Sequence, residues 1–270
     1  MDYSIIIPTC NRNDLLELCL NKLLEATNFV KNISIEIIVS DDSLNNDAKG
    51  LIETKYSMVK WIQGPKKGPA ANRNNGSNNS KAEWLIFLDD DCLPTLNLIS
   101  AYQTAIMHRE SHQLVFEGKI IADRNQKRFD EEAPININGG SLWSCNFCIQ
   151  RDLFNNIGQF DEQFPYPSME DADLNERLLK KHEIIFLENA TVIHPWRKVE
   201  FLKNFYPKLY SYKYFIKKHY QQSKYSFRLS RVKIFMHGVF NNFILLSKFR
   251  FKGIAYYFEL NLFNFISIFL

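Results

Sequence analysis

The chain has 270 residues, 46% of them hydrophobic and 23% charged, a balance typical of a globular protein with a sizeable core rather than of a disordered chain. Its net charge of +3 is unevenly spread, because residues 197–270 hold 14 Lys and Arg against Glu200 and Glu259, a local charge of +12 that leaves −9 on residues 1–196. This asymmetry predicts two regions with different partners, divided at that point.

Short apolar runs alternate with helical patterns at the start of the chain. Runs typical of buried strands lie at 3–8, 34–40, 58–63 and 84–88. Helical patterns lie between them, at 11–27, 47–55 and 70–80, the last begun by Pro69. This order predicts an α/β fold whose mostly parallel central sheet is covered by helices on both faces.

The pattern is more mixed further along the chain. Strands are expected near 114–121 and 144–150, with Gly139-Gly140 as a flexible point between them. A helix at 169–182 and two short strands at 184–187 and 191–193 follow. Residues 197–270 are expected to form a helical region appended to the sheet domain.

The cysteines and the apolar runs indicate the cellular compartment of the protein. The five cysteines are scattered and odd in number, which favours reduced, structural thiols in a cytosolic protein. The first apolar run is too short for a signal peptide. The nearest candidate for a membrane span, 253–270, is interrupted by Glu259, Asn261 and Asn264. We therefore expect a cytoplasmic protein.

Acidic residues follow two of the predicted strands. Asp41-Asp42 ends the second strand, and Asp89-Asp90-Asp91 ends the fourth. Ligands of parallel sheets bind at the carboxyl ends of strands, where these residues are expected to meet. Adjacent carboxylates repel one another unless a cation lies among them. The triplet therefore indicates either a divalent-metal site or, as the plainer alternative, a solvated acidic turn.

Seven motifs stand in a fixed order between Ser4 and Pro195. They are SIIIPTCNR (4–12), IIVSDDS (37–43), GPAANRNNG (68–76), FLDDDCLP (87–94), NIGQFDEQF (156–164), MEDADLNERL (169–178) and VIHP (192–195). Together they resemble the family 2 glycosyltransferases, which have a nucleotide-sugar-binding fold of the GT-A type. The chain departs from the family in having Ser43 where a glycine usually follows the aspartates, and Ser40 in place of a common apolar residue.

The resemblance implies a reaction and a metal. It implies an inverting, metal-dependent transfer of a sugar from a nucleoside-diphosphate sugar, UDP-sugar favoured, to the hydroxyl of a glycan or lipid-linked acceptor in surface polysaccharide synthesis. A hard cation, Mn²⁺ or Mg²⁺, would offset the charge of the diphosphate. Asp91 is the favoured metal ligand, with Asp89 and His194 as further ligands. Asp89 or Asp90 is the expected partner of the ribose.

The resemblance also implies a set of residues around the donor. These are Pro8, Thr9, Asn11, Arg12, Asp41, Asp42, Gly68, Arg73, Asp89 and Asp90. Asp42 would accept the imino N–H of uracil, with Asp41 as the alternative, and a helix-capping turn is the plainer, less favoured role of the pair. Gly68 would let the backbone approach the donor, unless it is a plain turn glycine. Arg73 would be a fixed cation, unless it lies on the surface.

Glu170-Asp171 begins a predicted helix at the place where the family carries its acidic pair. By resemblance Asp171 is the general base that takes the proton of the acceptor hydroxyl, with Glu170 as second choice. We expect the helix N-terminus to keep these carboxylates ionised at neutral pH, and simple capping is the alternative role. A single base without a second nucleophile favours one-step displacement with inversion. Asp173 is expected to be structural.

Residues 200–270 carry 21 of the 38 aromatic residues of the chain, within the basic region. Such a segment could contact an anionic membrane surface, pack as helices or an oligomer interface, or bind nucleic acid. The resemblance favours peripheral membrane contact, possible at the inner face of the cell membrane, and no nucleic acid is expected.

Two other functional classes share parts of this pattern. A sugar-nucleotide nucleotidyltransferase would carry a Gly-rich, basic loop after the first strand, where this chain reads PTCNRND. A non-catalytic carbohydrate- or nucleotide-binding module would have no need for both the acidic edge and the acidic pair that opens a helix.

Overall fold

The structure is a computed structural model that describes residues 2–221 and 224–270. It divides into two compact units. The first comprises the chain up to Asp123 together with Pro134–Glu162 and Glu170–Pro195. The second comprises Arg124–Ala133, Gln163–Met169 and Trp196–Leu270.

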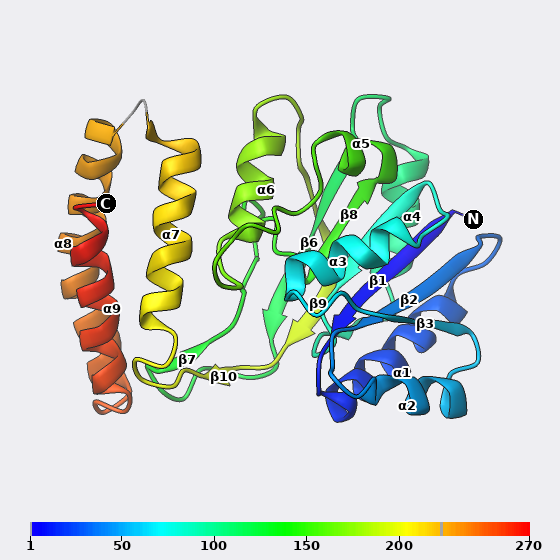
Figure 1. The fold of residues 1–270 in the computed structure, drawn as a ribbon, viewed down its shortest axis with the longest axis horizontal. Coiled ribbons are helices and arrows are strands. Elements are labelled where there is room, and N and C mark those ends of the chain that lie inside the picture. Colours follow the sequence, from blue (N-terminus) through cyan, green and yellow to red (C-terminus); the bar gives the residue numbers. More distant parts are fainter. Residues whose placement is uncertain (1, 222–223) are drawn as a thin grey trace. The chain divides into compact units, whose positions relative to one another are not determined.

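The first unit is built on one sheet, which has eight strands in the described part of the chain, in the order β3-β2-β1-β4-β8-β6-β9-β5 (Figure 1). Their bounds are β1 Tyr3–Thr9, β2 Ile35–Asp41, β3 Val59–Gln63, β4 Trp84–Leu88, β5 Leu93–Pro94, β6 Val115–Ala122, β8 Asn146–Gln150 and β9 Ile185–His194. The first four strands in this order run parallel, β8 runs antiparallel to both β4 and β6, and β5 runs antiparallel to β9. The expected mostly parallel sheet is confirmed.

Helices cover both faces of this sheet. They are α1 Asn13–Phe29, α2 Asp47–Lys55, α3 Pro69–Asn78, α4 Leu98–Met107, α5 Arg151–Asn156 and α6 Glu170–Leu179. Successive side chains of a strand point to opposite faces, so Ile5 joins a core with residues of α1, α2 and α4, and Ile6 joins a second core with residues of α5 and α6. Gly76 lets α3 approach β1 closely, because a Cβ at that position would collide with Ile6. The expected α/β arrangement, with helices on both faces of the sheet, is present.

Several strand and helix predictions differ from the structure. Helices α4 and α5 were not predicted, although Leu98, Tyr102 and Ile106 are buried at helical spacing. The two short strands expected after residue 183 are one strand, β9, whose pairing with β6 is shifted next to Gly118. A Cβ at Gly118 would meet Asn146 and the Ala190 carbonyl, so the close strand packing requires glycine there.

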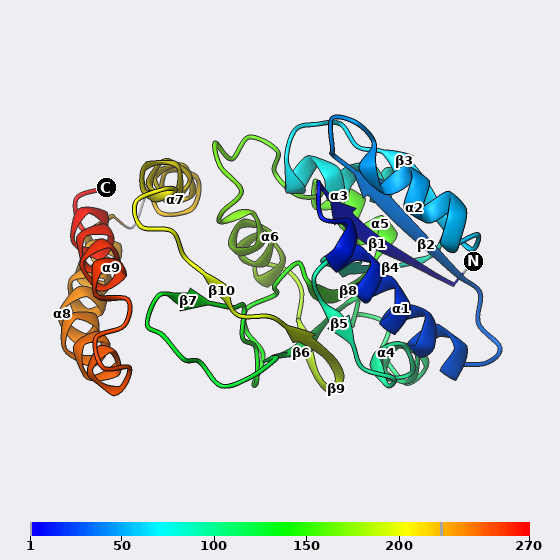
Figure 2. The ribbon, with the colours of Figure 1, turned by 90° about the horizontal axis from the view of Figure 1, so that it is seen from below.

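The second unit contains the expected C-terminal helices. They are α7 Phe205–His219, α8 Lys224–Lys248 and α9 Ile254–Ser267, and two short strands, β7 Glu131–Glu132 and β10 Arg197–Lys198, pair antiparallel. Helices α8 and α9 lie side by side in both views (Figures 1 and 2). Gly253 begins α9 at φ +96°, and a Cβ there would lie 2.6 Å from the Asp130 nitrogen. Among the described residues, none of the helices combines the length and the hydropathy needed to cross a bilayer.

Candidate active site

The carboxyl ends of the parallel strands β1, β2 and β4 lie at one edge of the sheet, and backbone hydrogen bonds join the loops that leave them. Asp42 N donates to Thr9 O at 2.9 Å, and Gly64 N donates to Asp41 O at 2.8 Å. Asn72 of α3 donates through Nδ2 to Ser40 O at 2.8 Å. Most of the residues predicted to contact the nucleotide sugar therefore lie on loops that hydrogen bonds join to one another. Asn72 belongs to this network, although it was not among the predicted residues.

Asp90 ties the loop after β1 to the loop after β4. Its carboxylate is fully buried and accepts hydrogen bonds from Thr9 Oγ1 at 2.8 Å and from Arg12 Nε at 3.1 Å. Arg12 Nη2 lies 2.5 Å from the other oxygen. This carboxylate fixes the two loops against each other. Asn11, in the same loop, is exposed and adopts φ +54°.

Asp89 pairs with a buried cation. Arg73 Nη2 lies 2.6 Å from Asp89 Oδ1, and Arg73 is only 5% exposed. Burial disfavours the charge of Arg73, but the carboxylates of Asp89, Asp171 and Glu170 more than offset this and raise the pKa of the guanidinium. Arg73 is thus a permanent positive charge inside the site, and the alternative of a surface arginine is wrong.

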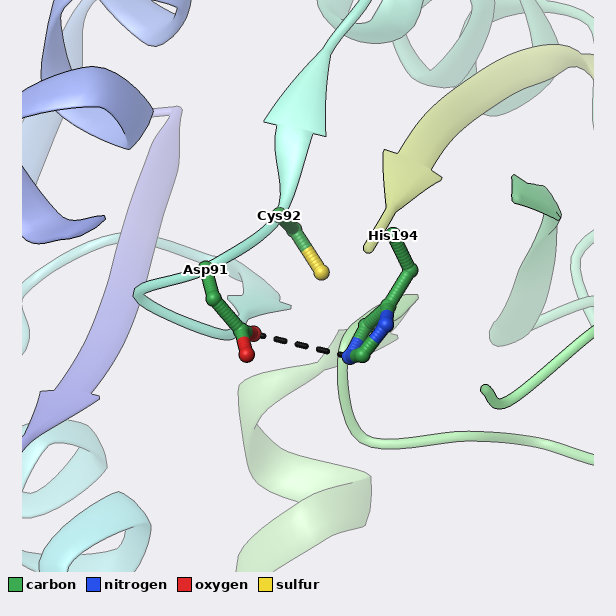
Figure 3. A group of neighbouring side chains, drawn as sticks. All are labelled: Asp91, Cys92 and His194. Carbon is green, nitrogen blue, oxygen red and sulfur yellow. Dashed lines mark ion pairs between the residues drawn. The ribbon is translucent and has the colours of Figure 1, made fainter. Parts of the chain in front are cut away.

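Asp91 and His194 face each other, with Cys92 beside them (Figure 3). One ligand atom from each of the three lies within 4.8 Å of the others, and all three residues are buried. His194 Nε2 is 3.5 Å from Asp91 Oδ1, while Nδ1 lies 2.8 Å from Pro195 O. The contact with the Pro195 carbonyl favours the proton on Nδ1, so the lone pair of Nε2 is directed toward Asp91.

This group suits a divalent cation such as Mn²⁺. Carboxylate oxygen and neutral imidazole are ligands that such ions accept, and burial lowers the pKa of His194, which keeps the ring neutral. Burial also raises the pKa of the Cys92 thiol well above its usual value, so Asp91 and His194 are the better ligands. Cys92 was not predicted, although it directly follows the triplet. Asp89 is held by Arg73 and, among the described residues, is not part of this group.

Asp41 and Asp42 have different environments. Asp41 is fully buried, and its oxygens accept hydrogen bonds from Ser43 N and Ala48 N, both at 3.0 Å, so it caps the turn that leads into α2. Asp42 is half-buried, and its carboxylate accepts hydrogen bonds from Lys66 N at 2.7 Å and Gly68 N at 2.9 Å. Asp42 therefore holds the loop that opens α3.

Gly68 and Pro8 belong to the same edge. Gly68 is the N-cap residue of α3 with φ +91°, a conformation that glycine adopts without strain. Pro8 is buried within β1.

Glu170 and Asp171 stand in the first turn of α6, as predicted. Ser144 donates to Asp171 Oδ2 from its backbone N–H and from Oγ, both at 3.2 Å. Glu170 Oε1 lies 3.9 Å from Arg73 Nη1. Asp171 Oδ1 and Glu170 Oε2 are shielded from solvent and have no hydrogen-bond partner among the residues that the structure describes.

Glu170 and Asp171 are less readily ionised than we expected from their position at a helix N-terminus. Burial, followed by the charge of Asp171, raises the pKa of Glu170 to about 7, and burial also raises the pKa of Asp171. The helix N-terminus does not outweigh the loss of hydration. A raised pKa suits a general base, because proton transfer is most effective when the pKa lies near the working pH.

Glu117 is a buried carboxylate that the sequence analysis missed. It accepts hydrogen bonds from Leu142 N at 2.9 Å and Ser141 N at 3.2 Å, and also from Gly140 N. The loop expected to be flexible at Gly139-Gly140 is therefore fastened just before Ser144. No motif around Glu117 could have disclosed these contacts, because the backbone N–H groups that donate to it are more than twenty residues away, and Asn136, which donates through Nδ2, is also distant in sequence.

Comparison with known proteins identifies the family of this arrangement. The model of glycosyl transferase family 2 matches residues 4–157. The chain is 31% identical over 146 residues to a GalNAc(5)-diNAcBac-PP-undecaprenol beta-1,3-glucosyltransferase of Campylobacter jejuni, covering 49% of this chain and 45% of that protein. It is 35% identical over 94 residues to the poly(ribitol-phosphate) beta-N-acetylglucosaminyltransferase TarP of Staphylococcus aureus, covering 33% of this chain and 28% of the relative. The chain thus spans less than half the length of these two relatives.

Solved structures share the fold. TarS 1-349 of S. aureus in complex with UDP-GlcNAc has a TM-score of 0.56 at 20% identity, over 80% of this chain and 67% of that one. GalNAc-T7 with UDP, GalNAc and Mn²⁺ has a TM-score of 0.64 at 15% identity, over 86% of this chain and 51% of that one.

Proposed function

Because the chain belongs to glycosyltransferase family 2 and has the GT-A fold, we propose that it is an inverting, metal-dependent glycosyltransferase. It moves a hexosyl or N-acetylhexosaminyl group from a nucleoside-diphosphate sugar, UDP-sugar favoured, to a hydroxyl of a glycan or lipid-linked acceptor in surface polysaccharide synthesis. The observation that carries the proposal is that two groups stand in the first unit: Asp91 faces His194, and Arg73 pairs with the neighbouring Asp89 and lies 3.9 Å from Glu170. Residues 1–196 hold this chemistry.

The named relatives support the choice of substrates. One is named for a PP-undecaprenol substrate and another for poly(ribitol-phosphate), and the TarS structure contains UDP-GlcNAc. A lipid-linked or polymeric acceptor and a UDP-sugar donor are therefore the classes to test first.

Asp91 and His194 would hold the cation, Mn²⁺ or Mg²⁺, while Asp89 stays paired with Arg73. When bound, the metal supplies positive charge that offsets the charge of the donor diphosphate. Arg73 adds a fixed positive charge nearby, since its ion pair with Asp89 keeps it in place. Asp89, whose side chain is partly exposed, would meet the ribose in preference to Asp90, whose carboxylate is fully buried against Thr9 and Arg12.

The nucleoside would lie along the loops after β1 and β2. Asp42 would accept the imino N–H of uracil, because its carboxylate is half-exposed and its position is fixed by Lys66 N and Gly68 N. Asp41 is fully engaged inside the protein, so Asp42 is preferred over it. Pro8 and Thr9, with Asn11 and Arg12 beyond them, would line the same pocket.

Asp171 is the proposed general base. Ser144 holds its Oδ2, and Oδ1 remains to receive a proton from the acceptor hydroxyl. The acceptor oxygen then bonds to the anomeric carbon as the bond from that carbon to the diphosphate breaks, which inverts the configuration in one step. Glu170 lies beside it and is the second choice for this role.

The test is a screen of nucleoside-diphosphate sugars for hydrolysis with Mn²⁺, with Mg²⁺ and with a chelator. We expect turnover of at least one UDP-sugar that depends on the metal and is lost in Asp91→Ala. Asp173→Asn is the control, because Asp173 is also buried but forms an ion pair with Arg177 within α6. Full activity of Asp91→Ala, or activity indifferent to the chelator, would refute the metal site.

A further inference from the structure

Helix α9 exposes a row of large apolar side chains. Ile254, Phe258, Leu262, Phe265 and Phe269, which extends the row just past the helix, are between 46% and 65% exposed. They are three or four residues apart, so they lie along one face. We call these five residues the α9 stripe.

Helix α8 carries a similar row. Its members, Tyr225, Leu229, Val232, Met236, Phe240 and Phe243, are between 40% and 78% exposed and are also three or four residues apart. We call them the α8 stripe. Such continuous exposed apolar faces mark a surface that contacts a partner or a membrane.

Polar and aromatic contacts join these two helices, the aromatic ones between Phe235 and Phe265 and between Phe243 and Tyr257. Arg231 of α8 donates to Ser267 Oγ and to Asn264 Oδ1 of α9, both at 2.9 Å. Tyr257 of α9 donates to Val239 O at 3.2 Å. These contacts hold α8 and α9 against each other, and the residues of both stripes nevertheless stay between 40% and 78% exposed, so large apolar side chains remain at the surface.

The surroundings of the stripes are strongly basic. Arg228, Lys233 and Lys248 on α8, and Arg250 and Lys252 in the turn before α9, are exposed. Between residues 205 and 270 the sequence has one acidic residue, Glu259, which is buried and accepts a hydrogen bond from Leu202 N. Acidic side chains are therefore not available in this segment to neutralise the exposed basic ones.

We propose that the two stripes and their basic surroundings bind the surface of an anionic lipid bilayer, with the stripes inserted at the boundary between headgroups and acyl chains. Apolar and aromatic side chains on one face with Lys and Arg around them are the features of helices that lie in this interface. A second copy of the chain is a poorer occupant, because a symmetric contact would bring two equally basic surfaces together. This inference does not depend on the proposed transfer reaction.

The experiment is flotation of the full chain with vesicles of phosphatidylcholine alone or mixed with phosphatidylglycerol. We expect binding to the mixed vesicles that weakens with salt, and a loss of about tenfold for each of Phe258→Ser and Phe265→Ser. Met58→Ser and Met107→Ser are the controls, because these methionines are 75% and 71% exposed in the first unit. Both controls should bind as wild type does.

A second pair of variants tests the charge. Arg228→Gln with Lys233→Gln should weaken binding to the mixed vesicles at low salt and leave the weaker binding to phosphatidylcholine unchanged. Circular dichroism of each variant checks that its helices are retained, and Phe269→Ser, just past the end of α9, replaces any stripe variant that unfolds. Wild-type binding by the stripe variants would overturn the proposal. So would a lipid-free wild-type dimer that the stripe substitutions convert to a monomer.

Discussion

Ser144 donates two hydrogen bonds to a single oxygen of Asp171, from its backbone N–H and from Oγ, both at 3.2 Å. Hydrogen bonds to a carboxylate favour its ionised form, so these bonds counteract the burial that raises the pKa of Asp171. Glu117 accepts hydrogen bonds from the loop that carries Ser144 and so holds Ser144 in place. The pKa of Asp171 therefore depends on residues outside the Glu170-Asp171 pair.

Ser144→Ala removes the hydroxyl bond and leaves the backbone bond in place. We expect the pKa of Asp171 to rise further, since the carboxylate loses a hydrogen bond that favours its ionised form. A base must be deprotonated to act, so the acid limb of the profile of kcat/KM against pH moves to higher pH. The measurement is that profile. Ser141→Ala, in the same loop, is the control and should leave the limb in place, and an unmoved limb in Ser144→Ala would contradict the assignment.

Arg73→Met breaks the ion pair with Asp89 and leaves buried carboxylates without their cation. We expect the free energy of unfolding to fall by about 3–5 kcal/mol, as for other buried pairs that lose one partner. Chemical denaturation measures this difference. The matched control is Arg109→Met, because Arg109 stacks on Trp84, with 5.0 Å between the guanidinium carbon and the ring centroid, and also bonds a backbone carbonyl. A loss no larger than that of the control would show that the Arg73 pair is not critical for stability.

Glu170 makes stability depend on pH. Its pKa is about 7 in the folded chain and about 4.5 in its ordinary state, so between these values the folded chain keeps a proton that the unfolded chain has lost. The contribution is complete below pH 4.5, and the free energy of unfolding falls as pH rises toward 7, by up to about 3 kcal/mol. Glu170→Gln should flatten this decline in denaturation curves recorded with a chelator. An unchanged slope in the variant would contradict the raised pKa.

Gly64→Ala tests the nucleoside side of the site. A Cβ at Gly64 would collide with Asp42 Oδ1 and would lie 2.6 Å from Asn72 Oδ1. The displaced Asp42 should weaken binding of UDP by about tenfold, comparable to the loss of one hydrogen bond to a charged group. Calorimetric titration with UDP measures this. Gly50→Ala, where a Cβ meets nothing within 4 Å, is the control, and equal affinities in the two variants would contradict the role of Asp42.

The alternation of strands and helices up to Leu88 was predictable because each element there has a strong pattern of its own. Ile5, Ile6 and Ile7 form a fully buried run, and Leu16, Leu20 and Leu23 repeat at helical spacing. Helix α4 has buried apolar residues at helical spacing as well, but this helix was not predicted. The joining of two expected short strands into β9 could not be predicted, since it depends on pairing with β6 across a bulge.

The sequence motifs indicated which candidate residues lie near one another, but they did not disclose the contacts that each residue makes. The acidic motifs placed Asp89, Asp90 and Asp91 together, yet their roles depend on partners distant in sequence: Arg73 for Asp89, Thr9 for Asp90 and His194 for Asp91. The raised pKa of Glu170 likewise arises from burial, which a single sequence does not disclose. Glu117 and Ser144 support the site through contacts with the backbone and with Asp171, which leave no motif.

The central claim is that Asp171 is the base of a glycosyl transfer. The most direct measurement is the turnover of the UDP-sugar selected by the hydrolysis screen, compared between Asp171→Asn and Asp173→Asn of the same helix. We expect Asp171→Asn to lower kcat by about a thousandfold, with donor binding retained, since a general base contributes about 10²–10⁴. Asp173→Asn should lose stability and keep kcat. Turnover by Asp171→Asn at the wild-type rate would contradict the account.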